Sequence, residues 1–238
     1  MSAPLKSLIF SPTAKHTATV IFLHGLGDSG HGWSDPVSRV LRPALPHVKW
    51  ILPHALPVAV TANFGMTMPA WFDIRSFDFE TGEDEGGMLR TVSSVNQLIS
   101  AEVDSGIDPG RIVIGGFSQG AAMSILTGLT NERKLAGIVC LSGWVVLRSK
   151  FKAMSSSHAS SIPIFWGHGT ADPIVRFEIG KSSVEYLKTN LGLPAVPSGA
   201  SDAVALKGVM FREFPGLQHG ASAEELIELR EWLGSVLS

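Results

Sequence analysis

Short runs of apolar residues alternate along the chain with longer segments in which apolar residues recur at helical spacing. Six runs are short and apolar at successive positions, as expected of strands buried on both faces of a parallel sheet. These predicted strands cover residues 18–23, 48–52, 111–115, 135–141, 162–166 and 208–214. The helical spacing predicts helices over residues 87–103, 118–129, 177–189 and 223–237. Strands that alternate with helices in this way predict an α/β fold with a doubly wound, mostly parallel sheet.

Two segments do not fit this alternation. Residues 53–69 are apolar and bounded by prolines but show no clear period, which predicts a structured loop with exposed apolar side chains. Residues 191–206 are rich in Pro, Gly and Ser and carry one charge, Asp202, which predicts a surface insertion. The 238 residues fit one large domain, so we expect a single domain over residues 1–238 that includes this insertion.

Composition and charge exclude several classes of protein. Hydrophobic residues make up 45% of the chain, charged residues 17%, and the mean hydropathy is +0.23, all typical of a packed globular core. The net charge is −2 and the basic residues are scattered, so we expect no nucleic-acid partner. The single cysteine, Cys140, excludes an intrachain disulfide or a multi-cysteine metal site, and its apolar strand predicts core packing. Without a signal-peptide pattern or a long apolar run, the expectation is a soluble protein of the cytoplasm, with the nucleus as a second location.

The pentapeptide Gly-Phe-Ser-Gln-Gly at residues 116–120 follows a predicted strand and precedes a predicted helix. This is the context of a nucleophile elbow, in which a sharp turn exposes a serine hydroxyl at the end of a strand. Such a turn leaves no room for side chains beside the serine, which accounts for Gly116 and Gly120. The alternative is a chance glycine turn with a helix-capping serine. The context favours Ser118 as a nucleophile.

A serine hydroxyl is a weak nucleophile and needs a base. In folds with this elbow the acid and then the histidine follow the serine along the chain, which leaves His158, His168 and His219. His158 lies in a serine-rich stretch that is predicted as a loop. His219 lies between the last predicted strand and helix and is the predicted base. His168 also ends a strand. With His168 as the base, however, the order of an acid followed by a histidine would no longer be available later in the chain, so His168 is interpreted as a structural turn histidine.

The acid is expected in a loop that follows a strand, between the serine and the histidine. Asp172 fits because it comes shortly after the fifth predicted strand and precedes Pro173, which favours an extended loop. The other carboxylates lie on a helix, in a strand, in the insertion or elsewhere; they are Glu132, Glu178, Glu185, Asp202 and Glu213. Asp172 is therefore predicted to hold the tautomer of the histidine and to stabilise the imidazolium.

An oxyanion hole needs two backbone N–H donors. One is expected from Gln119, directly after the serine. The other is expected from Leu26, in the glycine-rich turn that ends the first predicted strand; a plain β-turn is the alternative. Asp28 and His31 lie nearby and are interpreted as residues that organise the loop.

Six separated segments resemble, in order, the acyl-protein thioesterases of the phospholipase/carboxylesterase group of α/β-hydrolases. The segments are residues 20–33, 68–76, 83–87, 111–124, 135–144 and 168–175. The resemblance implies a single α/β-hydrolase domain without a large cap. It also implies hydrolysis, through an acyl-enzyme, of thioesters that link palmitate to protein cysteines. The family's catalytic residues fall on Ser118, Asp172 and His219, and its oxyanion donors fall on Leu26 and Gln119.

The implied substrates are S-acylated proteins and, since several members also cleave them, lysophospholipids. No cofactor and no metal are expected. Some animal members carry an early cysteine that is itself palmitoylated. This chain has Ser2 instead, so at most a transient contact with a membrane surface is expected. The segment 191–206 is also longer than in the family.

The same sequence features are compatible with two other functions. A general carboxylesterase or lysophospholipase would use the same three residues. A catalytically silent hydrolase fold usually lacks one of them, and here all three are present.

Apolar side chains crowd into residues 53–72, and they cannot all reach the core from an irregular loop. Some are expected to line a groove for an acyl chain near Ser118, unless they pack the loop onto the sheet. The expected groove residues are Phe64, Met66, Met68, Trp71 and Phe72, together with Ile174 and Val175 beside the predicted acid.

Overall fold

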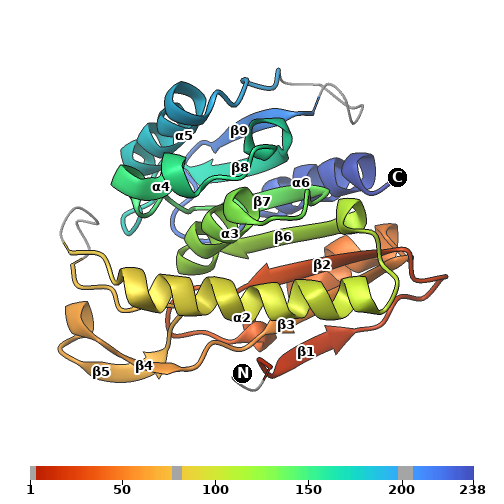
Figure 1. The fold of residues 1–238 in the computed structure, drawn as a ribbon, viewed down its shortest axis with the longest axis horizontal. Coiled ribbons are helices and arrows are strands. Elements are labelled where there is room, and N and C mark those ends of the chain that lie inside the picture. Colours follow the sequence, from red (N-terminus) through yellow and green to blue (C-terminus); the bar gives the residue numbers. More distant parts are fainter. Residues whose placement is uncertain (1–3, 77–81, 198–205) are drawn as a thin grey trace.

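A seven-stranded, mostly parallel sheet forms the centre of the protein (Figure 1). The computed structural model describes residues 4–76, 82–197 and 206–238. The strand order is β1-β3-β2-β6-β7-β8-β9, and every pair is parallel except β1 with β3. The strands are β1 (Ser7–Phe10), β2 (Ala18–Leu23), β3 (Val48–Pro53), β6 (Ile112–Phe117), β7 (Gly137–Leu141), β8 (Pro163–Gly169) and β9 (Gly208–Phe214).

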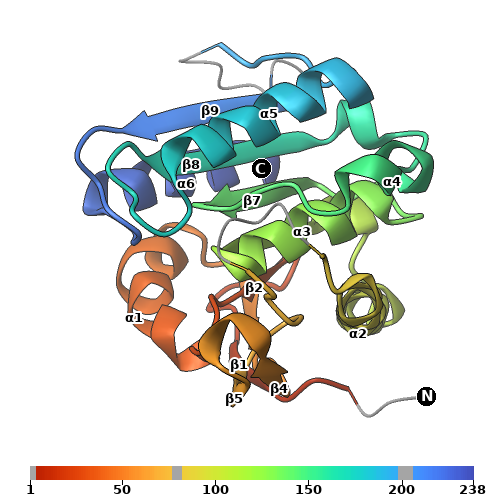
Figure 2. The ribbon, with the colours of Figure 1, turned by 90° about the vertical axis from the view of Figure 1, so that its left-hand side faces the viewer.

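Helices cover both faces of this sheet (Figure 2). On one face lie α2 (Glu85–Asp104), α3 (Gln119–Thr130), α4 (Arg148–Met154) and α5 (Phe177–Leu191). On the other lie α6 (Ala223–Val236) and a run of short helical turns over residues 30–44 that includes α1 (Ser34–Pro36). Among the residues that the structure describes, no separate cap domain stands over the sheet. The fold class predicted from the sequence is confirmed.

The central strands are apolar at successive positions because helices cover both faces of the sheet. In β2, Ile21 and Leu23 pack into the core on the α3 face, whereas Val20 and Phe22 pack into the core on the α6 face. Successive side chains of a strand point to opposite faces, so a strand between two helical layers needs an apolar residue at every position. Each of the six predicted strands and four predicted helices is present, with ends displaced by at most a few residues.

The interpretation of residues 53–69 as a loop is wrong in part. These residues contain a separate antiparallel hairpin, β4 (Pro57–Val60) and β5 (Met66–Pro69), which extends beyond the carboxyl edge of the sheet (Figure 1). Val60 is the one fully buried residue of the hairpin's two four-residue strands, so the sequence is too short and too exposed to show the clear alternation of a half-buried strand. The expected exposure of apolar side chains is confirmed: Phe64 at the hairpin tip is 99% exposed and Met66 is 59% exposed.

The predicted insertion at residues 191–206 is packed at its two ends. Leu193 and Leu206 are buried, and the Val196 backbone N–H donates to Val209 of β9 at 2.9 Å. These flanks are therefore anchored to the body of the protein at Leu193, Val196 and Leu206, while residues 192, 194, 195 and 197 are exposed. Residues 198–205 lie outside the described residues. Along the described ranges, no helix combines the length and apolar character needed to cross a bilayer.

Cys140 lies in β7 and is completely buried, as the apolar pattern predicts. Its sulfur occupies the space that a side chain at Gly143 would need, since a Cβ atom there would lie 2.6 Å from Sγ. Burial raises the pKa of the Cys140 thiol well above its usual range. The thiol is therefore a neutral packing group.

Glu225, in the first turn of α6, is a buried carboxyl group. Its side chain fills the position that a Cβ atom of Gly167 in β8 would occupy, and its exposed fraction is 0%. Neither carboxyl oxygen has a hydrogen-bond partner within the part of the chain that the structure describes. Burial, with a smaller contribution from the charge of Glu228, raises the pKa of Glu225 to about 8. The group is therefore protonated at neutral pH.

This burial predicts a specific pH dependence of stability. Between about pH 4.3, the pKa of an unfolded glutamate, and about pH 8, the folded state holds a proton that the unfolded state has released. The free energy of unfolding should therefore fall as pH rises through this window, by at most about 1.4 kcal/mol per pH unit from this group. In Glu225→Gln this contribution should disappear, as measured by urea unfolding at several pH values between 5 and 8.5.

The exposed neighbour Glu224 is the matched control. Glu224→Gln should keep the pH slope of the native protein. Equal slopes in the native protein and in Glu225→Gln would mean that Glu225 is ionised in the folded state.

Candidate active site

Ser118 occupies the sharp turn between β6 and α3. Its backbone has φ 54° and ψ −119°, a conformation that costs energy for any residue except glycine and is typical of functional turns. A Cβ atom at Gly116 would lie 2.4 Å from the carbonyl carbon of Gly120, and one at Gly120 would lie 2.3 Å from the carbonyl oxygen of Leu23. The expectation that neither glycine has room for a side chain is confirmed.

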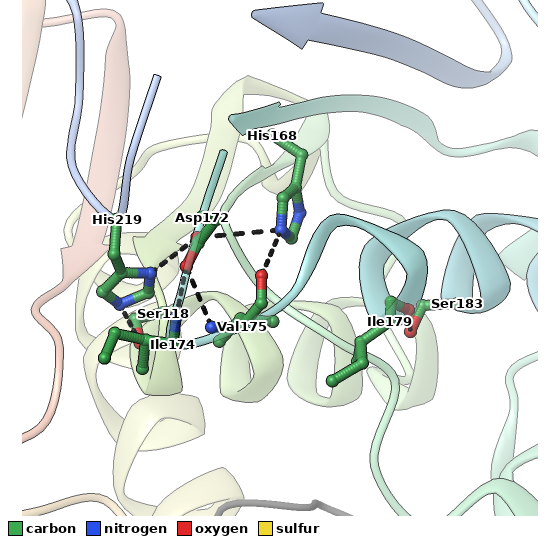
Figure 3. Close-up of polar contacts among 8 residues, drawn as sticks. All are labelled: Ser118, His168, Asp172, Ile174, Val175, Ile179, Ser183 and His219. Carbon is green, nitrogen blue, oxygen red and sulfur yellow. Dashed lines mark hydrogen bonds and ion pairs between the residues drawn. The ribbon is translucent and has the colours of Figure 1, made fainter. Parts of the chain in front are cut away.

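The structure brings Ser118, His219 and Asp172 into direct contact (Figure 3). His219 Nδ1 lies 2.7 Å from Asp172 Oδ2, and His219 Nε2 lies 2.9 Å from Ser118 Oγ. The three residues follow β6, β8 and β9, whose carboxyl ends lie at one edge of the sheet. Because a carboxylate only accepts hydrogen bonds, Nδ1 carries the proton and Nε2 is free to accept the serine proton. Such a pair can activate a hydroxyl for attack on a carbonyl carbon.

The Asp172 carboxylate is buried but well supported. Its Oδ1 accepts hydrogen bonds from the backbone N–H groups of Ile174 at 2.8 Å and Val175 at 3.0 Å. Burial by itself raises the pKa of Asp172, but the hydrogen bond and charge of His219 and the Ile174 N–H outweigh burial, so the pKa is lowered. Asp172 is therefore ionised at neutral pH.

His168 is a structural histidine, as predicted, but it lies within β8 rather than in a turn. It is fully buried, and its Nε2 lies 2.8 Å from the carbonyl oxygen of Val175 and 3.8 Å from Asp172 Oδ2. Burial lowers the pKa of His168, so the neutral ring donates to Val175 and holds the loop that supports the Asp172 carboxylate. His158 precedes β8, at the opposite end of that strand from Asp172.

Leu26 and Gln119, the predicted oxyanion donors, both have a free backbone N–H. Within the described ranges, neither group donates to another protein atom. The turn that contains Leu26 closes when the Asp28 N–H donates to Gly25 O at 3.3 Å, so it has the geometry of a β-turn. This turn lies beside the serine, since a Cβ atom at Gly25 would be 3.5 Å from Ser118 Cβ. The two donors can therefore face one bound oxygen.

Sequence reasoning missed the side chains that hold these two backbone segments. The buried Gln119 side chain accepts from the Trp71 N–H at 2.9 Å and donates to Phe72 O at 2.8 Å. The Trp71 indole N–H donates to His24 O at 2.7 Å. Another missed contact is Phe117, whose ring lies 4.7 Å from the His219 ring, centroid to centroid. In the sequence, only the positions of His24 and Phe117, next to the two glycine-containing turns, could have indicated that these residues contribute to the site.

The seven predicted groove residues fall into two groups. Trp71, Phe72 and Val175 are at most 3% exposed. Trp71 and Phe72 nevertheless line a cavity beside α2, whereas Val175 packs in the core. The amino-acid composition of these segments does not show whether such a side chain points toward the core or toward the surface. The others are partly or fully exposed; they are Phe64, Met66, Met68 and Ile174.

The chain is similar over nearly its whole length to known proteins. The model of the family described as phospholipase/carboxylesterase matches residues 5–236. A Cryptococcus neoformans protein named acyl-protein thioesterase 1 is 51% identical, with all of both chains aligned. A protein of the same name from Schizosaccharomyces pombe is 43% identical, over 100% of this chain and 99% of its own.

Solved structures agree with this result. Acyl-protein thioesterase 2 of Zea mays superimposes with a TM-score of 0.82 at 29% identity, over 98% of this chain and 99% of the other. SOBER1 of Arabidopsis thaliana also gives a TM-score of 0.82, at 31% identity, over 93% of this chain and 100% of the other. The described architecture is therefore that of an α/β-hydrolase.

The contact between Ser118, His219 and Asp172 predicts how each substitution affects reactivity. Ser118→Ala should abolish labelling by a fluorophosphonate probe and lower the rate of p-nitrophenyl ester hydrolysis by about 10⁴- to 10⁶-fold. His219→Ala should cost about as much, and Asp172→Asn somewhat less, because the three groups act as a unit.

His168→Ala is the comparison variant, since His168 touches the Asp172 loop but not Ser118. It should lower stability more than rate. A greater rate loss in His168→Ala than in His219→Ala would assign the base to His168 instead.

Proposed function

The chain belongs to the phospholipase/carboxylesterase family, and on that premise we propose that it is a serine hydrolase that removes long-chain acyl groups, palmitoyl in particular, from protein cysteines. The observation that carries this proposal is the continuous hydrogen-bonded path from Ser118 through His219 to Asp172. The relatives named as acyl-protein thioesterases support the thioester as the bond that is cleaved. S-acylated proteins are therefore the proposed substrates.

The first half of the reaction acylates the enzyme. His219 Nε2 takes the proton of Ser118 while the serine oxygen attacks the thioester carbonyl carbon. The backbone N–H groups of Leu26 and Gln119 hold the resulting oxyanion, aided by the positive end of the α3 dipole. As the carbon–sulfur bond breaks, the imidazolium returns its proton to the departing cysteine sulfur. The products are an ester of Ser118 and a free protein thiol.

The second half of the reaction releases the fatty acid. Water attacks the ester carbonyl carbon and His219 accepts a water proton, so that a second oxyanion forms in the same hole. Collapse of this intermediate breaks the bond to Ser118 Oγ, which regains a proton from His219. Throughout, the ionised Asp172 stabilises the imidazolium without taking its proton. The chain's own residues account for each proton transfer.

The acyl chain is proposed to follow the inner face of the β4–β5 hairpin. Met68 Sδ lies 3.8 Å from a Cβ position at Gly27, in the turn of Leu26. Val58 pairs directly with Met68 across the hairpin, and paired residues lie on the same face. From Val58 the path leads into a cavity of about 310 Å³ between the hairpin and α2. Its apolar lining includes Leu56, Val58, Ala70, Trp71 and Phe72.

This path predicts a steep dependence on acyl chain length. Each buried methylene contributes about 0.8 kcal/mol, or nearly fourfold in binding. The value of kcat/KM for thioesters should rise from C2 toward C16 and level off where the groove ends, measured below the micelle concentration. Met68→Ala and Val58→Ser should reduce the advantage of the long chains and leave the C2 rate unchanged.

Ile227→Ser, at an exposed apolar position on α6, is the matched control and should leave the whole profile unchanged. A flat profile, or an optimum at C2 to C4, would favour a general carboxylesterase over the proposed thioesterase. A steep profile that changes only with Ile174→Ala would place the groove along the loop that follows Asp172.

A further inference from the structure

His24 is a fully buried histidine at the point where β2 ends and the turn of Leu26 begins. Its Nε2 accepts a hydrogen bond from the backbone N–H of Ala55 at 3.0 Å, and its Nδ1 lies 2.7 Å from the carbonyl oxygen of Gly25. The amide can only donate and the carbonyl can only accept. The ring is therefore the tautomer in which Nδ1 carries the proton and donates to Gly25. Burial lowers the pKa of His24, which favours this neutral form.

The Nδ1–H bond determines where the next N–H group points. Gly25 O and the Leu26 N–H belong to the same peptide unit, which is planar and trans, so the two groups point in opposite directions. A hydrogen bond that holds Gly25 O toward the imidazole therefore directs the Leu26 N–H away from it. Gly25 lies beside Ser118, and among the described residues the Leu26 N–H has no protein acceptor.

Without this bond the peptide unit would be easy to rotate. The Gly25–Leu26 peptide unit has a glycine on one side and lies one residue before a second glycine, Gly27. Gly27 has a φ of 77°, in the left-handed region that glycine adopts without strain. The remaining restraint on Gly25 O is a longer hydrogen bond of 3.3 Å from Asp28. The imidazole thus supplies the shorter of the two hydrogen bonds that orient this peptide.

We propose that His24 is a positioning residue of the oxyanion hole: its Nδ1–H fixes the Gly25–Leu26 peptide so that the Leu26 N–H faces the acyl oxygen bound at Ser118. This inference rests on the proposed hydrolase function, and it adds a role for a residue outside the Ser118–His219–Asp172 path. Preorganised donors stabilise a developing oxyanion because they need not reorient when its charge appears.

The same histidine ties the two halves of the hole together. Its carbonyl oxygen accepts from the Trp71 indole, and the Trp71 backbone N–H donates to the side chain of Gln119. Gln119 is the residue that would supply the second oxyanion donor. Both donor segments are therefore braced against Trp71, which keeps them in a fixed relation.

Two substitutions separate the hydrogen bonds of His24. Asparagine places an N–H near the position of Nδ1, so His24→Asn keeps the donor to Gly25 O and loses the acceptor for Ala55. Glutamine reaches the position of Nε2, so His24→Gln keeps the acceptor for Ala55 and loses the donor to Gly25 O. Each variant loses one buried hydrogen bond, so both should show a similar fall in melting temperature.

Activity should distinguish the two variants. With p-nitrophenyl acetate, His24→Gln should lower kcat by about 10²- to 10³-fold, the cost of one oxyanion donor, with little change in KM. It should weaken binding of a trifluoromethyl ketone, which forms an oxyanion adduct with Ser118, by a similar factor. His24→Asn should keep kcat within about tenfold of the native value, since the oriented donor is retained.

Equal losses of kcat in the two variants, or losses that follow the melting temperature, would overturn the proposal and leave His24 a packing residue. The native protein provides a second test, because nitrogen NMR at pH 7 should show the Nδ1–H tautomer of His24. An Nε2–H tautomer or an imidazolium would also overturn it. If the native protein cleaves p-nitrophenyl acetate but no acyl thioester, the proposed substrate fails while the His24 comparison still decides the role of His24.

Discussion

The close approach of α3 to the end of β2 is the constraint on which the site depends. The backbone of Gly120 packs directly on the carbonyl groups of Leu23 and His24, where a Cβ atom would be within 2.5 Å of either oxygen. This contact joins the turn that carries Ser118 to the turn that carries Leu26. The two segments are far apart in sequence, yet they can serve one bound oxygen because no side chain separates them. Any residue larger than glycine would displace one donor from the other.

The parallel sheet explains how three distant residues meet. His219 is 101 residues from Ser118 and 47 from Asp172. Parallel strands end at the same edge of a sheet, so the loops after β6, β8 and β9 all emerge at one edge whatever the lengths of the helices between them. The cost of burying Asp172 is offset locally by two backbone N–H groups and the imidazole. The sheet brings these groups together, and the loops determine their final geometry.

Chain order and apolar runs were enough to anticipate the sheet and the contact set of Ser118, Asp172 and His219. Apolar runs and the order of residues along the chain can be read directly from the sequence, without knowing how the side chains pack. The antiparallel edge strand β1 and the β4–β5 hairpin were missed because four-residue strands with at most one buried residue leave little alternation in the sequence.

The direction in which an individual side chain points could not be predicted from the sequence, because it depends on tertiary contacts. Glu224 and Glu225 both look like charged residues at a helix N-terminus, but only Glu225 turns toward the sheet, into the space left by Gly167. The size and apolar character of Trp71 predict a groove residue but do not reveal its hydrogen bonds. The fold uses its indole N–H and its backbone N–H to brace the two turns. Such choices depend on tertiary partners that lie far away along the chain.

The burial of Cys140 has a consequence for the fate of the acyl group. An acyl-enzyme can pass its acyl group to a nearby thiolate as well as to water, because the thiolate is a nucleophile, and the proposed reaction itself releases thiols. The sole thiol of this chain is enclosed in β7 and held in its unreactive protonated form. The protein therefore offers the acyl group no internal sulfur acceptor, and its turnover can be followed with a thiol-reactive dye without a background signal from the folded enzyme.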